Sequence, residues 1–496
     1  MLDQKQRRQA EGLPLPEHRD VYYGGSWHKP KSGGYVEVHS PGSGELLGEI
    51  ADTGAADAEA AIAAAKQAFP AWRAKLPLER AAALRRIAQI VRDNAEELAL
   101  IDAADCGNPF GEMIRDATVG ATQLDYFAGL ALEAKGSTIP MGPDAVNYTV
   151  REPLGVVARI YPFNHPFMFC AAKMAAPLAA GNTVVMKPPE QAPLSTLRLA
   201  ELIDGVLPPG VFNVVPGGKE VGAVLASHID VAKVSVIGSV PTGKAVMEAA
   251  AGNLKQVLLE LGGKNALIAY PDADPEQVAA AVIDGMNFTW CGQSCGSTSR
   301  AFIHKAIYAE VLEHMKERVK AYRPGPPTER DTTMGAIVSK RQFDSIMGFI
   351  ETTKREGAEL LCGGGPPDDP ALANGFFIEP TIFTGMRPDM TIAMQEVFGP
   401  VLAVFDWEDE EAMIEAVNAV EYGLTSSIWT NDLATAHRTA ARVQAGYVWI
   451  NEVSRHFIGA PFGGYKQSGI GREESVEELF SFTQEKNVHV RLAPRG

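Results

Sequence analysis

Two cysteines, Cys291 and Cys295, lie one helical turn apart in the stretch NFTWCGQSCGSTSR, residues 287–300. Structural cysteines are usually buried among aliphatic side chains, whereas these two stand among glycine, serine, threonine and glutamine. A thiolate attacks carbonyl carbon and later releases the acyl group readily, so this setting indicates a nucleophile that forms thioesters. Cys295 is our candidate nucleophile, with an inert loop cysteine as the alternative. For Cys291 we favour simple packing.

A second candidate site is the segment GSVPTGKA at 238–245, which follows the strand-like run KVSVI. It departs from the phosphate-binding pattern GxxxxGK[ST] at Ala245, so the hydroxyl that binds magnesium is missing and ATP hydrolysis is not expected. A helix that begins after Gly238 and Ser239 would still offer free N–H groups to a pyrophosphate. An ordinary strand–turn–helix junction is the alternative. The common dinucleotide fingerprint GxGxxG does not occur in the sequence.

The composition is that of an ordinary globular protein. Hydrophobic residues make up 46% and charged residues 21% of the 496 residues, which suits a folded chain of more than one domain. A net charge of −16 argues against a nucleic-acid partner. We find neither a secretory signal nor an apolar run that could span a membrane. Five cysteines without CxxC spacing predict no disulfide framework and no metal site, so we expect a cytoplasmic protein.

The segments that must position these residues alternate between helices and strands. Helical patterns near 57–74, 77–105 and 112–134 come first, and strand-like runs such as GVVARIYP, NTVVMKP and VAKVSVIGS follow, separated by helical stretches. A second alternating series begins after ELGGK and ends with GYVWIN. Such alternation predicts parallel sheets with crossover helices, and these sheets bind ligands at the carboxyl ends of their strands. We therefore expect an α/β fold of two units with a boundary near residue 262.

Six motifs, in a fixed order along the chain, carry a family resemblance. They are YPFNHP (161–166), VVMKPPE (184–190), LELGGK (259–264), the cysteine stretch, EVFGP (396–400) and PFGGYKQSGIGRE (461–473). Together they resemble the aldehyde dehydrogenase superfamily, over nearly the whole chain from about 20 to 490. The segments VIGS and PFN vary slightly from the family's commoner FTGS and PWN but keep the reactive side chains. The resemblance implies a non-acylating enzyme that uses NAD(P).

The family likeness also implies a domain plan. A Rossmann-like cofactor-binding domain would comprise 1–135 and 151–261, and an α/β catalytic domain 262–478. A small β oligomerisation ribbon would comprise 136–150 and 479–496. The last two segments alternate like strands and fit neither unit, and exposed strand edges usually find a partner. We therefore expect a homodimer or homotetramer.

The catalytic residues that the resemblance implies are Cys295, Glu260 and Asn164. Cys295 would add to the aldehyde, and the resulting thiohemiacetal alkoxide would be held by the Asn164 side-chain amide and the backbone N–H of Cys295, donors worth about 3 kcal/mol each. Collapse of the alkoxide would expel hydride to the nicotinamide. Glu260, beside two glycines that would let it swing, would then activate the water that cleaves the thioester. Taken singly, each of these residues has an ordinary structural alternative, such as a turn asparagine at 164.

The likeness places the cofactor on two sets of residues. Lys187 and Glu190 would hold the adenosine ribose, where a carboxylate repels a 2′-phosphate, so NAD is expected in preference to NADP, which stays possible. Gly238 and Ser239 would lie at the pyrophosphate. Glu396 and Phe398 would contact the nicotinamide ribose.

The substrate pocket that the likeness implies is more polar than a tunnel for simple alkyl aldehydes. Its residues would be His165, Phe169, Thr289, Ser294, Arg455 and His456. Arg455 could bind a substrate carboxylate, with a solvated loop arginine as the alternative. PFNHP is similar to a subgroup of carboxybenzaldehyde-type dehydrogenases, and the broader likeness runs to betaine aldehyde enzymes. We expect an aromatic or carboxylate-bearing aldehyde, with betaine aldehyde or an aliphatic semialdehyde as alternatives.

Rival classes make different predictions. An acylating, CoA-dependent dehydrogenase is disfavoured because Glu260 supplies the base that activates water. A cysteine-dependent ester hydrolase would turn over without any nucleotide, although neither His165 nor His456 has a spacing diagnostic of such an enzyme. A non-catalytic protein of this fold would leave Cys295 inert.

Overall fold

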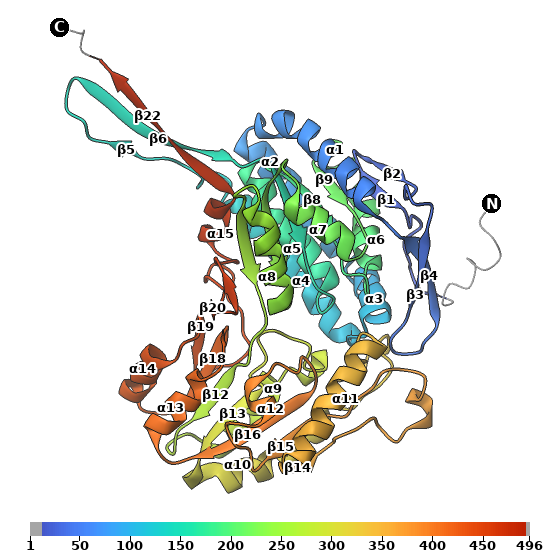
Figure 1. Cartoon of the computed structure of the whole chain (residues 1–496), viewed down its shortest axis with the longest axis vertical. Helices are drawn as coiled ribbons and strands as arrows, with labels where there is room; N and C mark the ends of the chain where they lie inside the picture. The colour runs from blue at the N-terminus through green and yellow to red at the C-terminus, as the bar shows by residue number, and fades with distance from the viewer. Residues whose placement is uncertain (1–11, 493–496) are drawn as a thin grey trace.

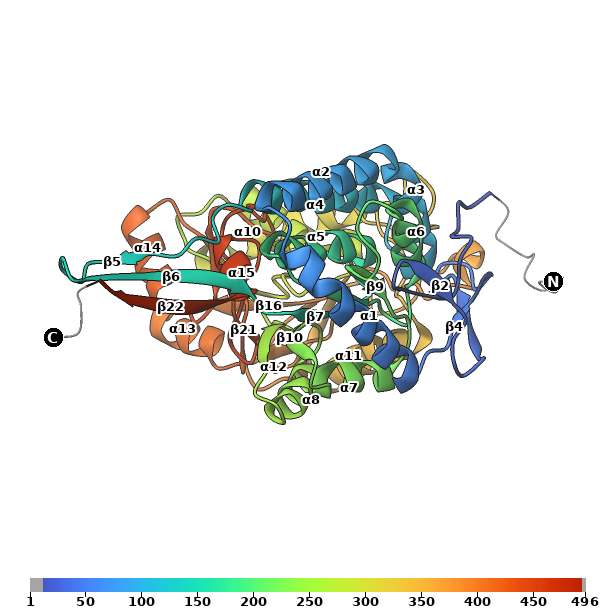
Figure 2. The ribbon, with the colours of Figure 1, turned by 90° about the horizontal axis from the view of Figure 1, so that it is seen from above.

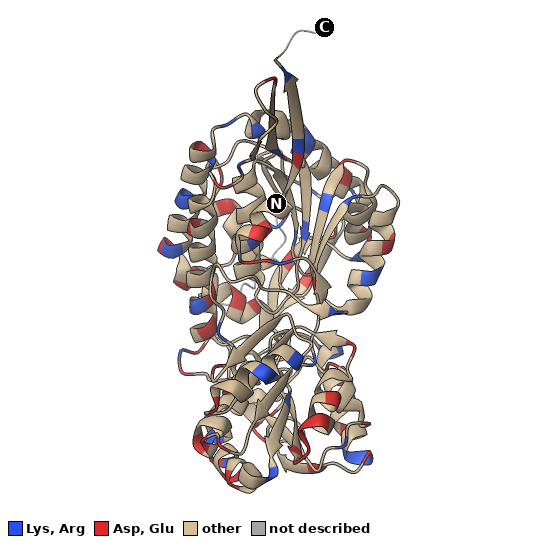
Figure 3. Ribbon diagram, turned by 90° about the vertical axis from the view of Figure 1, so that its left-hand side faces the viewer, with Lys and Arg blue, Asp and Glu red and all other residues tan. Residues whose placement is uncertain are grey.

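The structure is a computed structural model that describes residues 12–492. Two α/β units lie one above the other, and a narrow β-ribbon projects from one side of the upper unit (Figure 1). No helix within residues 12–492 is long and apolar enough to cross a membrane. Acidic and basic residues are interspersed along both units, as Figure 3 shows, and form no continuous basic band in that view.

The first unit is built on an eight-stranded sheet whose five central strands are parallel. These strands are almost wholly buried, which explains their runs of valine and isoleucine. In spatial order the strands are β2 (Ser26–His28), β1 (Val21–Tyr23), β9 (Phe212–Val214), β8 (Thr183–Lys187), β7 (Val156–Ile160), β10 (Val231–Ile237), β11 (Gln256–Glu260) and β21 (Gly469–Ile470).

Helices surround this sheet. They are α1 (Ala55–Arg73), α2 (Pro77–Asp93), α3 (Ala95–Cys106), α4 (Phe110–Gly129), α5 (Pro166–Ala180), α6 (Leu194–Leu202), α7 (Lys219–Ser227), α8 (Val240–Ala251) and α15 (Val476–Ser481). The single helix predicted over 77–105 is two, because the chain breaks at Asn94, whose side chain bonds back to the carbonyl of Ile90. Gly107 ends α3 in the left-handed region, at φ 88°.

The order of the parallel strands defines where a ligand can bind. From β7 the chain runs outward through β8 and β9, and it then returns to the other side of β7 as β10 and β11. Loops leaving the carboxyl ends of β7 and β10 therefore diverge, and in open α/β sheets the ligand crevice lies at this switch point. Asn164 follows β7, Ser239 follows β10, and Lys187 and Glu260 are the last residues of β8 and β11.

The second unit has a seven-stranded sheet that is parallel except for its edge strand β14. Its strands, in spatial order, are β14 (Glu359–Cys362), β15 (Thr381–Thr384), β16 (Val401–Trp407), β13 (Arg300–His304), β12 (Ala266–Ala269), β18 (Thr425–Trp429) and β19 (Tyr447–Ile450). Its helices are α9 (Pro275–Gly285), α10 (Lys305–Arg318), α11 (Lys340–Arg355), α12 (Thr391–Met394), α13 (Glu410–Asn418) and α14 (Leu433–Arg442), with 3₁₀ turns η2 (Phe288–Trp290), η3 (Val319–Ala321) and η4 (Pro370–Leu372). The α/β fold that the sequence predicts is confirmed.

The chain crosses back to the first unit near its end. Strand β21 pairs antiparallel with β11, with Gly469 opposite Glu260. This strand falls inside the range 262–478 expected for the catalytic domain, yet it belongs to the first sheet. The crossing brings the segment after PFGGYK next to the candidate base.

Strands far apart in the sequence form the projecting ribbon. Strand β22 (Thr483–Arg491) pairs antiparallel with β6 (Ala145–Pro153) over nine residues, and β5 (Thr138–Ile139) pairs with the other edge of β6. Figure 2 shows the ribbon from above, extending away from helices α1, α3 and α6 of the first unit. The two segments predicted as ribbons thus pair with each other, and the first residues of 479–493 are helical, in α15. Residues 493–496 lie outside the described part.

Short hairpins complete the fold. The segment YVEVHSPGSGELLGEI forms a hairpin of β3 (Tyr35–His39) and β4 (Leu46–Ala51). Strand β17 (Tyr422–Gly423) pairs with β20 (Tyr465–Lys466) beside the crossing segment.

Candidate active site

Cys295 lies in the loop between η2 and β13, where its backbone is held firmly. The Asn265 side chain donates hydrogen bonds to the carbonyl oxygens of Cys295 and Ser297, at 2.7 and 3.0 Å. A Cβ added to Gly263 would lie 2.9 Å from the Cys295 carbonyl oxygen. Glycine is needed there because the LELGGK turn passes directly against the nucleophile loop.

Cys291 has the packing role that the sequence favours. Its side chain is fully buried in the core of the second unit, and its thiol contacts the carbonyl oxygen of Ala336 at 3.6 Å. Burial raises the pKa of this thiol to about 12. A thiol held neutral in an apolar core is chemically inert.

Cys295 and Glu260 are neighbours, and each shifts the pKa of the other. Burial raises the pKa of the Cys295 thiol well above its usual range, and the neighbouring Glu260 carboxyl adds to this effect. Burial likewise raises the pKa of Glu260 to about 8, with the contact to Cys295 acting in the opposite direction. The Oε1 atom of Glu260 is buried and has no hydrogen-bond partner among residues 12–492. A thiol next to a carboxyl group of near-neutral pKa has the chemistry required of a nucleophile and a neighbouring base.

Asn164 lies in the turn between β7 and α5. Its backbone carbonyl accepts a 2.8 Å hydrogen bond from the Asn108 side chain, which fixes the turn. Its own side chain is buried, and Oδ1 has no hydrogen-bond partner in the described part of the chain. An amide that the protein leaves unsatisfied is available to a bound molecule.

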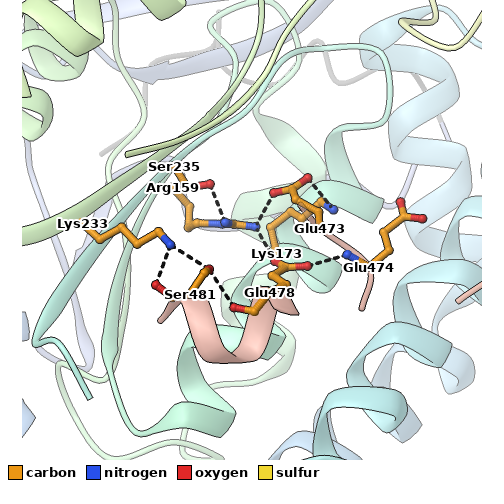
Figure 4. A network of polar contacts seen from close by, with 8 residues as sticks. All are labelled: Arg159, Lys173, Lys233, Ser235, Glu473, Glu474, Glu478 and Ser481. Atoms are coloured by element: carbon orange, nitrogen blue, oxygen red, sulfur yellow. Dashed lines mark hydrogen bonds and ion pairs between the residues drawn. The ribbon is translucent and has the colours of Figure 1, made fainter. Parts of the chain in front are cut away.

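A buried network of charged residues, shown in Figure 4, acts on the pKa of Glu260. Lys173 on α5 forms a 2.9 Å ion pair with Glu473, and Arg159 on β7 contacts Glu473 and Glu478 at 3.3 Å each. Glu473 raises the pKa of Glu260 and Lys173 lowers it. Sequence reasoning missed this group. A lysine in the apolar run PFMFCAAKMAAPLAA was the available signal, because a buried charge needs a partner.

The charge of Lys173 lowers the pKa of Glu260, against the larger effect of burial. Since Glu260 accepts a proton only when ionised, the thioester hydrolysis rate should rise with pH through about 8. In Lys173→Met the rise should move to higher pH by roughly one unit or more, because the cation that favours the carboxylate is gone. Stopped-flow measurement of the hydrolysis step across pH checks this. Lys173→Arg, which keeps the charge, is the control. An unshifted profile in Lys173→Met would contradict the assignment.

Lys187 and Glu190, predicted at the adenosine ribose, lie at the carboxyl end of β8. Lys187 is buried and its amine donates to the carbonyl oxygen of Pro188 at 3.2 Å. Burial lowers the pKa of Lys187 to about 8, opposed by Glu190. Glu190 is exposed, and a Cβ on Gly218 would lie 3.1 Å from its Oε1 atom. Both side chains thus face the amino end of α7, beside the ligand crevice.

Gly238 and Ser239 form the turn between β10 and α8. The N–H of Gly238 donates to the carbonyl oxygen of Glu260 at 3.0 Å, which ties this turn to the candidate base. Ser239 is exposed and caps α8 by accepting from the N–H of Thr242. The predicted helix start at the crevice is therefore present.

Glu396 and Phe398 come from the second unit and close the site from the opposite side. Glu396 accepts a 2.8 Å hydrogen bond from the N–H of Gly263, and a Cβ on Gly262 would lie 2.1 Å from its Oε2 atom. Burial raises the pKa of Glu396 to about 7. Phe398 packs edge-on against Phe163, at 5.9 Å between ring centroids. The two residues bridge the units within reach of the Cys295 loop.

Four of the six predicted pocket residues lie at the start of α5, in η2 or beside the nucleophile loop. His165 and Phe169 lie together at the start of α5, 5.4 Å apart, and Trp290 of η2 lies 5.6 Å from His165, with Thr289 in the same turn. His456 approaches the nucleophile loop, because a Cβ on Gly296 would lie 3.9 Å from its Nε2 atom.

The remaining two pocket candidates face other partners. Ser294 lines a small cavity together with Glu396 and Phe398. Arg455 is 65% exposed, lies 3.8 Å from Glu452 and stacks over Phe457.

A thiol–carboxyl pair beside the crevice of a doubly wound sheet has the parts of a cysteine-dependent dehydrogenase. Residues 27–488 match the aldehyde dehydrogenase family, so the chain belongs to this family and is an oxidoreductase that acts on aldehydes. The family assignment confirms the resemblance found in the six motifs.

The similar proteins cover the chain almost end to end. The aldehyde dehydrogenase tropH of Talaromyces stipitatus is 50% identical, over 97% of this chain and 95% of that protein. A betaine aldehyde dehydrogenase of Cereibacter sphaeroides is 42% identical, over 94% of this chain and 95% of that one. The structure of PnpE from Pseudomonas sp. WBC-3 in complex with nicotinamide adenine dinucleotide has a TM-score of 0.94 and 41% identity, over 96% of this chain and 98% of that one.

Proposed function

We propose that this enzyme oxidises an aromatic aldehyde to its carboxylic acid with NAD, through a covalent thiohemiacetal and then a thioester on Cys295. The neighbouring thiol of Cys295 and carboxyl group of Glu260 carry the proposal. The carboxyl group, with a pKa of about 8, can take the thiol proton as the sulfur attacks. The aldehyde carbon then gains a bond to sulfur, and its oxygen becomes an alkoxide.

Asn164 stabilises the alkoxide. Its side chain is buried, and its Nδ2 donates no hydrogen bond to any residue within 12–492, so this N–H can meet the developing charge without first breaking another bond. The backbone N–H of Cys295 is the second donor. In a site closed to water such donors are worth about 3 kcal/mol each.

The residues at the crevice suit NAD by their chemistry. The capped amino end of α8 can receive a pyrophosphate. Gly218 lies so close to Glu190 that a Cβ would meet the carboxylate, so a ribose hydroxyl can approach it, whereas a 2′-phosphate would be repelled. When bound, NAD takes up the hydride that leaves the substrate carbon.

Glu260 completes the cycle. After its proton has passed to solvent, the carboxylate can take a proton from a water that attacks the thioester, and Cys295 is released as a thiol. This role separates the enzyme from acylating dehydrogenases, in which CoA would take the acyl group. We expect NADP to be used less well, since Glu190 is exposed where the 2′-phosphate would lie.

An aromatic substrate is supported by the rings near the site. Phe163, Phe169 and Trp290 surround the Asn164 turn. A carboxylate-bearing substrate would depend on Arg455 as its partner. Arg455 lies against Glu452 and Phe457, so its charge is already engaged. The betaine aldehyde dehydrogenase relatives make a trimethylammonium aldehyde the second candidate.

Formation of reduced nicotinamide tests the proposed function. The purified enzyme should reduce NAD with benzaldehyde, without CoA, at a kcat/KM at least about tenfold above that with betaine aldehyde or an aliphatic semialdehyde. NADP should give a higher KM. Aldehyde consumption that requires CoA, or ester hydrolysis without nucleotide as the sole activity, would overturn it. A preference for betaine aldehyde would overturn the aromatic assignment alone.

The ribbon supports a homodimer or homotetramer. Five apolar side chains on or beside its strands are exposed, namely Ile139, Met141, Val146, Tyr148 and Val490. A strand edge with apolar neighbours favours pairing with another copy. Free cysteines at all five positions suit the cytoplasm that we propose as its location.

A further inference from the structure

His165 and Asp116 form a pair that the family assignment does not explain. The Nδ1 atom of His165 lies 2.7 Å from Oδ2 of Asp116, which projects from α4. Asp116 is buried and His165 is 15% exposed. A buried carboxylate that holds one ring nitrogen fixes both the orientation of the imidazole and the position of its proton.

The position of His165 at the start of α5 does not account for the pair. His165 stands at the N-cap, yet its side chain makes no capping hydrogen bond. The first free N–H of the helix, that of Phe167, donates instead to Asp102 on α3 at 3.1 Å. The helix end is therefore satisfied by another carboxylate, and the imidazole is left for a different contact.

The second nitrogen of the ring, Nε2, has no partner within the described residues. Because Nδ1 faces Asp116, Nε2 is the remaining hydrogen-bonding atom, and it bonds to no residue within 12–492. The ring is next in sequence to Asn164 and packs against Phe169 and Trp290, with 5.4 and 5.6 Å between centroids. A flat substrate held between such rings would bring its substituents to Nε2.

We propose that His165, oriented by Asp116, selects aromatic aldehydes that carry a hydroxyl group on the ring. The inference rests on the proposed function and adds the substituent that the pocket recognises. A hydroxyl group both donates and accepts, so it can bond to Nε2 in either protonation state of the imidazole. A methyl group of similar size can do neither.

The charges around the pair disfavour a carboxylate substituent. Asp116 and Glu112 on α4 and Asp102 on α3 all lie near the imidazole, and Arg115 is engaged by Glu112 at 2.9 Å. An anionic substituent would therefore approach a predominantly acidic wall, whereas a neutral hydroxyl group would not. His165 contacts the substrate, and Asp116 is a positioning residue.

The test is the ratio of kcat/KM for hydroxybenzaldehydes over the methylbenzaldehydes with the same ring position, meta and para. The ratio should be about tenfold or more in the parent enzyme, as expected for a buried hydrogen bond whose loss leaves a partner unsatisfied. His165→Phe should bring it close to one, and His165→Gln should restore part of it. His314→Gln, on the exposed face of α10, should leave it unchanged.

Asp116 is tested by epistasis. Asp116→Asn should lower the ratio in the parent enzyme and have no effect in the His165→Phe background, because Asp116 acts only through the imidazole. A merely structural aspartate would change both rates alike in either background and leave the ratio unmoved. NAD binding by each variant confirms that it is folded.

The outcomes separate this inference from the proposed function. A parent enzyme that oxidises benzaldehyde but shows no hydroxyl preference, or whose preference survives His165→Phe, overturns the role of the pair alone. A higher kcat/KM for carboxybenzaldehydes that depends on His165 also overturns it, in favour of an imidazolium that binds an anion. A parent enzyme that reduces no NAD with any aldehyde overturns the proposed function itself.

Discussion

Cys295→Ser should lower aldehyde oxidation on the order of 10⁴-fold or more, the scale of loss when a covalent nucleophile is removed. A serine hydroxyl is a far weaker nucleophile, and Glu260, with a pKa of about 8, cannot deprotonate it to a useful extent. The measurement is the steady-state formation of reduced nicotinamide. NAD affinity, measured by fluorescence titration, should stay close to that of the parent, because the thiol acts on the substrate.

Cys291→Ser is the matched control. It makes the same atomic change four residues away in the same loop, but in a side chain that packs against Ala336 in the core. Turnover should persist in this variant, with at most a modest loss of thermal stability. Loss of activity in Cys291→Ser with full activity in Cys295→Ser would reverse the assignment of the nucleophile.

Glu260→Gln should produce a single burst of reduced nicotinamide, close to one equivalent per active site, and then stall. The amide cannot take a proton from water, so steady turnover should fall by about 10² to 10⁴, the usual contribution of a general base. Sulfur attack is less affected, because loss of the Glu260 carboxylate also removes a charge that raises the pKa of the Cys295 thiol. Stopped-flow absorbance of the reduced cofactor measures both phases.

Hydroxylamine distinguishes this stall from general damage. It cleaves thioesters without base assistance, so its addition should restore turnover to Glu260→Gln but not to Cys295→Ser. Multiple turnovers at the parent rate in Glu260→Gln without any added nucleophile would show that Glu260 is not the base.

Local sequence signals were sufficient for the α/β elements, whereas the candidate site residues came from the resemblance carried by the six motifs. Four of these residues follow or end a short β-branched run: Asn164, Lys187, Ser239 and Glu260. A parallel sheet brings the ends of such runs together at one edge. The two glycines of LELGGK indicate a close approach of other segments. Gly262 lies against Glu396, and Gly263 lies against the Cys295 loop.

Contacts between distant segments could not be predicted in this way. Strand β21 joins the first sheet from residues 469–470, and this return alone brings Glu473 to Lys173 and Glu260. The strands β6 and β22 likewise pair although they are far apart in the sequence, and no local pattern encodes this pairing. A lysine in an apolar run, such as Lys173, predicts that a partner of opposite charge exists. It does not predict which carboxylate that partner is.

The same limit applies to His165. Its place beside Asn164 marks it for the pocket, but Asp116 lies 49 residues earlier, in the middle of a helix. Nothing in the helical pattern of α4 sets this aspartate apart from a solvated one. Its burial against the imidazole results from the packing of α4 against α5, which a local pattern does not encode.

The central claim is that the substrate becomes covalently attached to the sulfur of Cys295. Mass spectrometry of Glu260→Gln, quenched in acid after mixing with NAD and benzaldehyde, examines this directly. We expect a mass increase of one benzoyl group, carried by residue 295 in peptide mapping and removed by hydroxylamine. An unmodified protein after a completed burst, or an acyl group on any other residue, would contradict it.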